Sequence, residues 1–518
     1  MTTTDPAVGT VTTTTAHGPV AGTAPAGVAV FRGIPYGAPT GGEGRWAPPR
    51  PPAPWDDVLD CTATAVAAPQ NPSLLETALG SPGLVFDEDC LRVNVFSPDL
   101  AGSAPVMVWF HGGGFETGTP SMSWYDGSRL AARGVVVVAV GYRLGALGYL
   151  DVGDAPGSGC FGLLDQVAAL RWVAANAPAF GGDPDRVTVF GESAGAMSIG
   201  ALLGAPGARG LFHRAVLQSG STHNVHTPAT AARVAAQLAA AAGVAPGDLD
   251  ALRALDLDAV LAAQAAVGRE GDSSYGLPWQ PVLGSEEVPR PPLDAVRDGA
   301  AADVAVLVGT TLEEMKLFPL ITPSLYDVDD PALVARVAAY EAQVGRDHGS
   351  LLAAYAERTG TLPPSERFLA LLTDLVFRIP AIRLAEAQAA HGADVRMYLF
   401  AEGSDAFGGV LGSCHAMDLP FAWDNLDAPG TQVLFGEITE GRRRLARQMG
   451  DAWTAFARGV DDPAPHDGPA WPRYEPGRRA TLWLSADGLE VVDDPFGDER
   501  TWWDGLDAGL TDDLPLGG

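Results

Sequence analysis

Lysine is almost missing from this sequence of 518 residues, in which the only one is Lys316. A Walker loop that cradles phosphates requires Gly-Lys-Ser/Thr, so this nucleotide-binding motif is absent. Lys and Arg together number 33 against 63 for Asp and Glu, which gives a net charge of −30. A nucleic-acid-binding protein needs a basic face that displaces counterions, and this balance argues against such a partner. The acidity is typical of a solvated surface that keeps a protein soluble.

Cysteine and long apolar runs are also scarce. The four cysteines are Cys61, Cys90, Cys160 and Cys414. They are too scattered for a disulfide scaffold, and no Cys-x-x-Cys or Cys/His spacing indicates structural zinc. Residues 1–11 lack the basic patch and apolar stretch of a signal peptide, and the longest apolar run, 135–140, is far shorter than a membrane span. We therefore expect a cytoplasmic protein without a membrane partner.

Short runs rich in β-branched residues alternate with helical patterns along the chain. Buried strands are expected at 106–110, 135–140, 187–190, 216–218, 304–308 and 395–400. Apolar residues at three- and four-residue spacing predict a helix from about Leu163 to Ala174. This alternation predicts an α/β protein with a mostly parallel central sheet flanked by helices.

Two longer stretches, 229–300 and 328–393, interrupt this alternation and are rich in Ala and Leu. We interpret them as helical insertions over one edge of the sheet. No stretch has the composition of a flexible linker, and no repeat period stands out. Although the length alone suggests three domains, residues 1–518 are expected to form a single domain.

A serine stands between two glycines in Gly191-Glu-Ser-Ala-Gly195, the nucleophile-elbow pattern. The glycines permit a sharp turn from strand to helix that lifts the hydroxyl of Ser193 above the sheet. Five residues alone are a weak signal in a glycine-rich chain. The context strengthens it, because an expected strand ends at the elbow and residues 194–197 can begin a helix. Ser193 is therefore the candidate nucleophile.

Three glycines follow another expected strand, in His111-Gly112-Gly113-Gly114-Phe115. Such a loop lets backbone N–H groups approach and stabilise an oxyanion. In hydrolases with a nucleophile elbow, a second donor is the N–H of the residue after the nucleophile, here Ala194. Each motif follows a strand, and the two occur in the expected order.

A serine nucleophile needs a base, and histidine is the usual one. His415 lies in a loop after the expected strand that ends at Phe400, where a hydrolase of this organisation presents its base. The competitors His391 and His466 lie in polar segments that resemble solvated surface. An acid must orient the imidazole, and either Glu313 or Glu314 after the strand 304–308 is suitable, since spacing alone does not choose between them.

These motifs resemble the type-B carboxylesterase family of α/β-hydrolases, which includes cholinesterases and bacterial para-nitrobenzyl esterases. Residues 180–195 match the family's serine signature throughout, and 88–95 are similar to its second signature. The resemblance extends from about residue 16 to about residue 504 and implies the α/β-hydrolase fold, with the helical insertions over the active site.

The resemblance also assigns the site residues. It places the acid on Glu314, the base on His415 and the oxyanion donors on Gly113, Gly114 and Ala194. Departures from the family pattern are Met315, Ala416 and Asp418. Cys90 matches a cysteine that is disulfide-bonded in many secreted relatives, but its usual partner position holds Ala68, and Cys61 is only a displaced candidate.

We therefore expect a serine carboxylesterase that hydrolyses small-molecule esters with short to medium acyl chains through an acyl-enzyme, with no metal or cofactor. Amide or carbamate hydrolysis by the same triad is an alternative, as is a binding module that has lost catalysis, against which the intact triad argues. An ordinary histidine base predicts that activity collapses below roughly pH 6. Glu192 beside the nucleophile, together with the net charge of −30, favours neutral or cationic esters over anionic ones.

Overall fold

All six expected strands form, and they lie in one sheet of 13 strands. The computed structural model describes residues 9–63, 66–72, 84–267 and 277–506. The strands are β1 Thr10–Thr14, β2 Pro19–Thr23, β3 Ala29–Pro35, β4 Leu59–Asp60, β5 Arg92–Ser97, β6 Ala104–Phe110, β7 Val136–Val140, β8 Gly182–Glu192, β9 Arg214–Gln218, β10 Ala305–Thr311, β11 Val395–Phe400, β12 Ala480–Ser485 and β13 Gly488–Asp493.

The middle of the sheet is parallel, as the sequence predicts. Its strand order is β7-β6-β8-β9-β10-β11-β12, and every neighbouring pair in this series is parallel. Because parallel strands point the same way, their carboxyl ends share one edge of the sheet, where ligand sites form in open α/β sheets. The elbow, the glycine loop, the acid and the base all follow strands of this series.

Antiparallel strands at both ends of the sheet were not expected from the sequence. β1, β2, β3 and β5 form an antiparallel flank beside β7, and β13 pairs antiparallel with β12 at the far end. β1 consists of threonines and a valine, none of them buried, and β13 is likewise unburied. Such strands lack the apolar run that identifies a buried strand, which is why the pattern missed them.

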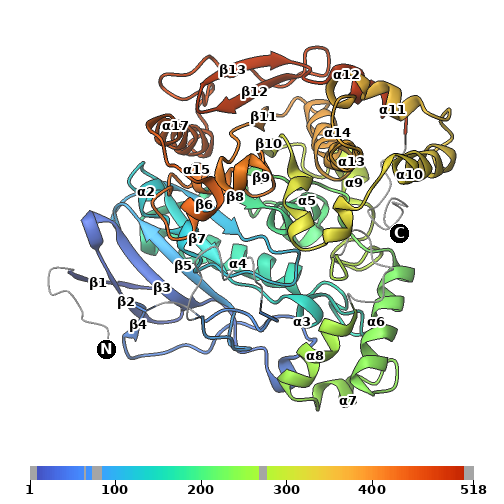
Figure 1. The fold of residues 1–518 in the computed structure, drawn as a ribbon. Helices are drawn as coiled ribbons and strands as arrows, with labels where there is room; N and C mark the ends of the chain where they lie inside the picture. Colours follow the sequence, from blue (N-terminus) through green and yellow to red (C-terminus); the bar gives the residue numbers. More distant parts are fainter. Residues whose placement is uncertain (1–8, 64–65, 73–83, 268–276, 507–518) are drawn as a thin grey trace.

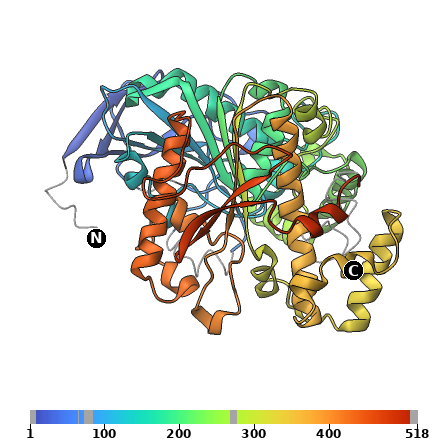
Figure 2. The ribbon, with the colours of Figure 1, turned by 90° about the horizontal axis from the view of Figure 1, so that it is seen from above.

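Helices cover both faces of the sheet, and Figure 2 shows them on either side of the strands. The α-helices are α2 Ser128–Ala131, α3 Gly145–Tyr149, α4 Phe161–Asn176, α5 Ala194–Gly204, α6 Pro228–Ala242, α7 Leu249–Arg253, α8 Leu257–Val267, α9 Pro292–Arg297, α10 Asp330–Gln343, α11 Ser350–Ala354, α12 Ala356–Thr359, α13 Pro364–Thr373, α14 Ile379–Ala389, α15 Leu419–Ala422, α16 Thr431–Phe435, α17 Glu440–Ala457 and α18 Gly497–Trp502. The helix expected around 163–174 is α4.

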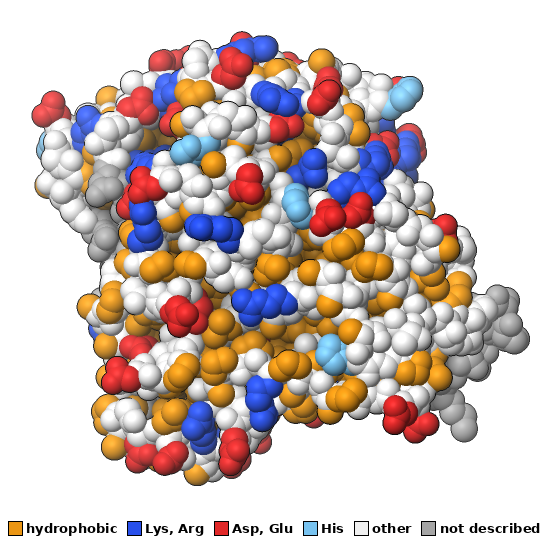
Figure 3. Space-filling model, turned by 180° about the vertical axis from the view of Figure 1, so that it is seen from behind, with side chains coloured by type: hydrophobic (Ala, Val, Ile, Leu, Met, Phe, Trp, Pro, Cys, Tyr) orange, Lys and Arg blue, Asp and Glu red, His pale blue; other side chains and the backbone are white. Residues whose placement is uncertain are grey.

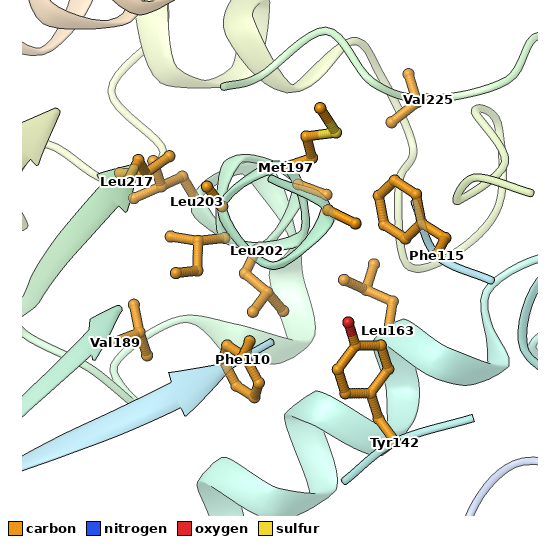
Figure 4. Close-up of a cluster of buried hydrophobic side chains, with 14 of the residues drawn as sticks. Phe110, Phe115, Tyr142, Leu163, Val189, Met197, Leu202, Leu203, Leu217 and Val225 are labelled. Atoms are coloured by element: carbon orange, nitrogen blue, oxygen red, sulfur yellow. The ribbon is translucent and has the colours of Figure 1, made fainter. Parts of the chain in front are cut away.

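The side chains of β6 point alternately into two layers of the core, one on each face of the sheet. Val106, Val108 and Phe110 belong to one buried cluster, whereas Met107 and Trp109 belong to the other. Successive side chains of a strand point to opposite faces, so the strand contributes to both layers. Figure 4 shows the first cluster around α5, the helix that follows the candidate nucleophile, with Phe110 beneath it. Each fully buried aliphatic or aromatic side chain contributes about 1.5–3 kcal/mol to this packing.

The two stretches interpreted as insertions are helical in the described residues. The first, 229–300, includes α7, α8, α9 and most of α6, and residues 268–276 of it lie outside the described part of the chain. The second, 328–393, includes α10 to α14 and a π-helical turn, η10 (Asp374–Arg378). In Figure 1, α6–α8 and α10–α13 lie to the right of the central strands. α13 packs against the short helical turn η7 (Glu314–Lys316), so the second stretch borders the candidate acid.

Candidate active site

Ser193 occupies the turn between β8 and α5 with backbone angles that few non-glycine residues adopt. Its φ is 53° and its ψ is −126°. Its N–H donates to the carbonyl of Gln218 at 2.9 Å, and its own carbonyl accepts from Met197 at 2.8 Å. The neighbouring strand and the helix thus hold the serine in a strained conformation, as expected of a nucleophile elbow.

Close packing explains why glycines flank the serine. A Cβ at position 195 would lie 1.9 Å from the carbonyl oxygen of Phe110, and one at 191 would lie 2.7 Å from the carbonyl carbon of Gly195. Both contacts involve backbone atoms, which have no rotamer by which to move away. The two glycines therefore allow the turn to pack directly on the end of β6.

The glycine loop 112–114 lies against the nucleophile. A Cβ on Gly112 would be 3.1 Å from the Cβ of Ser193, and Gly113 and Gly114 have φ of 113° and 63°. The Gly113 carbonyl accepts from the N–H groups of Glu116 and Thr117, whereas within the described residues the N–H groups of Gly113 and Gly114 donate to no partner. Ala194 begins α5, where helix N–H groups also lack intrahelical acceptors. Unused donors from two segments thus meet near Ser193.

The imidazole of His415 lies against the carboxylate of Glu314. His415 Nδ1 is 2.7 Å from Glu314 Oε2, and the two side chains are 7% and 0% exposed. The second oxygen, Glu314 Oε1, accepts the backbone N–H of Thr311 at 2.7 Å, and the His415 N–H donates to the Glu314 carbonyl at 3.2 Å. These bonds hold the ring in one orientation, with Nδ1 toward the carboxylate and Nε2 away from it.

The neighbouring carboxylate, Glu313, points elsewhere. Its Oε1 pairs with Lys316 Nζ at 2.7 Å, and its Oε2 accepts the N–H of Ser413 at 2.9 Å. The other two candidate bases interact with other groups than Glu314. His391 Nε2 contacts the carbonyl of Val296, and the side chain of His466 is 94% exposed. The choice that spacing left open is thus resolved by geometry in favour of Glu314 as the partner of His415.

Glu192 adds a buried carboxyl at the other ring nitrogen. Its Oε1 is 3.1 Å from His415 Nε2, and no hydrogen bond within the described residues joins the Ser193 hydroxyl to the ring. Burial raises the pKa of Glu192 to about 8. Burial opposes the charged form of His415, but the carboxyls of Glu192, Glu314 and Asp418 outweigh it and raise the pKa of His415 to about 9. The two groups titrate as a coupled pair.

Several neighbours of the imidazole were not identified from the sequence. The rings of Phe318 and Phe377 lie 5.3 Å and 5.0 Å from the ring of His415, between centroids. Phe318 begins the short helical turn η8 (Phe318–Leu320), and Phe377 belongs to η10. No motif marks either residue, because their contact with His415 depends on tertiary packing, in the case of Phe377 on the packing of the second insertion. Gln218 ends an expected strand and Asp418 departs from the family pattern, but nothing in the sequence indicates that they bond to each other.

The fold and this arrangement define a serine hydrolase of the α/β-hydrolase fold. A serine turn after a parallel strand, followed in chain order by an acid and then a histidine at the ends of later strands, is its hallmark. All four cysteines are free and buried. Within the described residues, no helix is long and apolar enough to cross a membrane.

Comparison with known proteins gives the family. The model of the Carboxylesterase family matches residues 8–495. The chain is 39% identical to para-nitrobenzyl esterase of Bacillus subtilis, over 94% of this chain and 97% of that protein. It is 34% identical to phenmedipham hydrolase of Pseudarthrobacter oxydans, over 93% and 96% of the two chains. The crystal structure of Geobacillus stearothermophilus carboxylesterase EST55 at pH 6.2 matches with a TM-score of 0.85 and 38% identity, over 95% of this chain and 99% of that one.

The chain therefore belongs to the carboxylesterase family and is a carboxylic-ester hydrolase. The resemblance drawn from the serine signature and the expected α/β-hydrolase fold are both confirmed. The comparisons argue against a non-catalytic binding module, because the relatives that match nearly the whole chain are named as an esterase and a hydrolase.

Proposed function

We propose that Ser193, His415 and Glu314 form the catalytic triad of a serine carboxylesterase for small esters with short to medium acyl chains. Ser193 Oγ attacks the ester carbonyl while His415 Nε2 takes the hydroxyl proton. The tetrahedral intermediate collapses, and the imidazolium gives its proton to the departing alcohol. Water then attacks the acyl-enzyme and loses its proton to His415. The imidazolium returns this proton to Ser193 Oγ as the acyl bond to Oγ breaks and the carboxylic acid leaves.

Gly113, Gly114 and Ala194 are proposed to stabilise the oxyanion of both tetrahedral intermediates through their backbone N–H groups. Loss of one such donor typically costs about 10²–10³ in turnover. The chemistry requires no metal or cofactor, since the triad supplies both the nucleophile and the proton transfers. We propose that it acts in the cytoplasm, as one domain whose insertions 229–300 and 328–393 shape the substrate pocket.

The observation that carries this proposal is the buried pair of His415 and Glu314, joined at 2.7 Å beside the elbow. The test is hydrolysis of para-nitrophenyl acetate, butyrate, octanoate and palmitate by the protein and by Ser193→Ala. We expect turnover of the shorter esters that disappears in the variant. Turnover that survives Ser193→Ala would overturn the nucleophile, and activity on palmitate alone would overturn the chain-length class.

Carbamate hydrolysis by the same triad is a second candidate, because the relative named phenmedipham hydrolase covers nearly the whole chain. A para-nitrophenyl carbamate assayed beside para-nitrophenyl butyrate separates the two. Faster turnover of the butyrate supports the esterase assignment, whereas faster turnover of the carbamate supports the alternative.

Substrate charge is a further part of the proposal. The net charge of −30 disfavours an anionic ester in the site, and the buried carboxyl of Glu192 adds to this effect where it is ionised. Matched para-nitrophenyl esters of butyrate and of hemisuccinate test this, with the neutral ester expected to have the higher kcat/KM. A faster reaction of the hemisuccinate would contradict it.

A further inference from the structure

Asp418 stands at the start of α15 but does not cap that helix. An aspartate there normally accepts from the helix's first N–H groups, yet Asp418 makes no such bond. Its Oδ2 instead accepts from the side-chain amide of Gln218 at 2.9 Å and from the hydroxyl of Tyr398 at 2.7 Å. The residue is fully buried, three positions after His415. Its carboxyl is thus turned away from the helix and toward Gln218 of β9 and Tyr398 of β11.

The amide of Gln218 links this carboxyl to the nucleophile. Gln218 is the last residue of β9, and its backbone carbonyl accepts the N–H of Ser193 at 2.9 Å. Its side-chain oxygen accepts from the indole of Trp453 at 3.2 Å, while its amide nitrogen donates to Asp418. The side chain is therefore held at both ends, and the strand terminus that it belongs to supports the strained elbow.

The charge of Asp418 is not balanced by a guanidinium or ammonium group. Within residues 9–63, 66–72, 84–267 and 277–506, no Arg or Lys forms an ion pair with it, and the cation that favours its ionised form is the protonated ring of His415. Burial raises the pKa of Asp418 to about 6, against the opposing effect of the hydrogen bonds from Tyr398 and Gln218. Most of the carboxyl is therefore ionised at pH 7 and above, where this charge acts on nearby groups.

Three carboxyls from three segments surround the imidazole of His415. Glu192 comes from β8, Glu314 from η7, and Asp418 from the loop that carries the histidine itself. The aromatic rings in contact with the imidazole, Phe318 and Phe377, are uncharged. Glu314 orients Nδ1 and Glu192 faces Nε2. Asp418 contacts neither nitrogen and acts on the ring only through space, since its oxygens bond to Gln218 and Tyr398.

We propose that Asp418 is a positioning residue with two roles: it fixes Gln218 beside the nucleophile, and its charge adds to those of Glu192 and Glu314 in favouring the protonated form of His415. The proposal rests on the proposed role of His415. A carboxylate near an imidazole favours the protonated ring, so Asp418 shifts the onset of activity toward higher pH. The first role depends on hydrogen bonds, and the second depends on charge.

Substitution by asparagine separates the two roles. The Oδ1 of an asparagine can still accept from Gln218 and Tyr398, but the charge is gone. We expect Asp418→Asn to move the acidic limb of the kcat/KM profile for para-nitrophenyl butyrate down by about 0.5 pH unit, because Asp418 contacts neither ring nitrogen. Asp418→Glu retains the charge and should leave the limb within about 0.1 pH unit of the unmodified enzyme.

Two further variants serve as a control and a second test. Asp424→Asn removes a carboxylate six residues along the chain that is paired with Arg133, and it should leave the limb unchanged. Tyr398→Phe removes a hydrogen bond that favours the ionised Asp418, so it should move the limb in the same direction as Asp418→Asn but by less. Tyr398→Phe preserves the ring and keeps the test usable if Asp418→Asn does not fold.

A readout that does not need turnover distinguishes failure of this inference from failure of the proposed function. The proton on His415 Nδ1, bonded to Glu314, gives a downfield NMR signal whose position follows protonation of the ring. Its titration midpoint should fall in Asp418→Asn as the kinetic limb does. An unmoved midpoint in both Asp418→Asn and Tyr398→Phe would overturn the electrostatic role, whereas a wild-type protein with this titration but no esterase activity would overturn only the proposed function.

Discussion

The two halves of the site are built on different principles. The nucleophile half, with the elbow at Ser193 and the glycine loop 112–114, depends on backbone positions that tolerate no Cβ. The base half, with Glu314 and His415, depends on buried charges that come from separate segments. The first half matches its family pattern closely, while Met315, Ala416 and Asp418 depart from it in the second. Steric requirements leave less freedom for substitution than a balance of charges, which several side chains can supply.

The largest expected effect tests the base half. Glu314→Gln removes the charge that stabilises the imidazolium and can leave the ring in the wrong tautomer, so kcat for para-nitrophenyl butyrate should fall by about 10³-fold. Glu313→Gln is the matched control, because it alters the adjacent carboxylate that pairs with Lys316. We expect it to lower kcat by less than about tenfold. Equal losses of kcat in the two variants would show that Glu314 is not the acid of the triad.

A smaller loss is expected from a change in the nucleophile half. Gly195→Ala places a methyl group where the Phe110 carbonyl already lies, so the elbow must shift. A displacement of about 1 Å typically costs about 10²-fold in rate, and overpacking lowers the free energy of unfolding by about 1–3 kcal/mol. Kinetics and urea unfolding measure both quantities. Gly477→Ala, at an exposed site with open space around it, should change neither.

The smallest effect concerns the pH profile. The pKa of His415 is raised to about 9, and only the unprotonated ring is a base. Activity of the unmodified enzyme should therefore rise with pH at more alkaline values than an ordinary histidine gives, with its acidic limb above pH 6.5. Glu192→Gln removes one source of the raised pKa, so the limb should move to lower pH, with kcat on the alkaline plateau changed by less than about tenfold.

An acidic limb that moves to higher pH in Glu192→Gln would contradict the expected direction of the shift. So would an unmodified enzyme that retains full kcat/KM at pH 5, where a base with a raised pKa is protonated. Asp424→Asn again provides the comparison, because its carboxylate belongs to an ion pair with Arg133.

Much of the fold followed from apolar runs, but the strands β3, β5 and β12 were not predicted although most of their residues are buried. The buried strands β6 to β11 and the helix α4 were predicted because burial on both faces requires continuous apolar sequence. The strands β1 and β13 were missed because their side chains are unburied, so pairing of the backbone alone forms them. The helices of the two insertions were expected as a class, but not the contact of α13 with η7.

The sequence by itself determined the nucleophile elbow, the glycine loop and the order in which serine, acid and histidine occur, because those features depend on local backbone geometry and on strand ends that share one edge. Only the tertiary structure chose Glu314 over Glu313 on physical grounds, and only it placed Glu192, Phe318 and Asp418 around His415. Glu192 and Phe318 are distant from His415 in sequence, and nothing in the sequence around Asp418 shows which way its carboxyl points. Charge and burial depend on distances that a one-dimensional pattern does not contain.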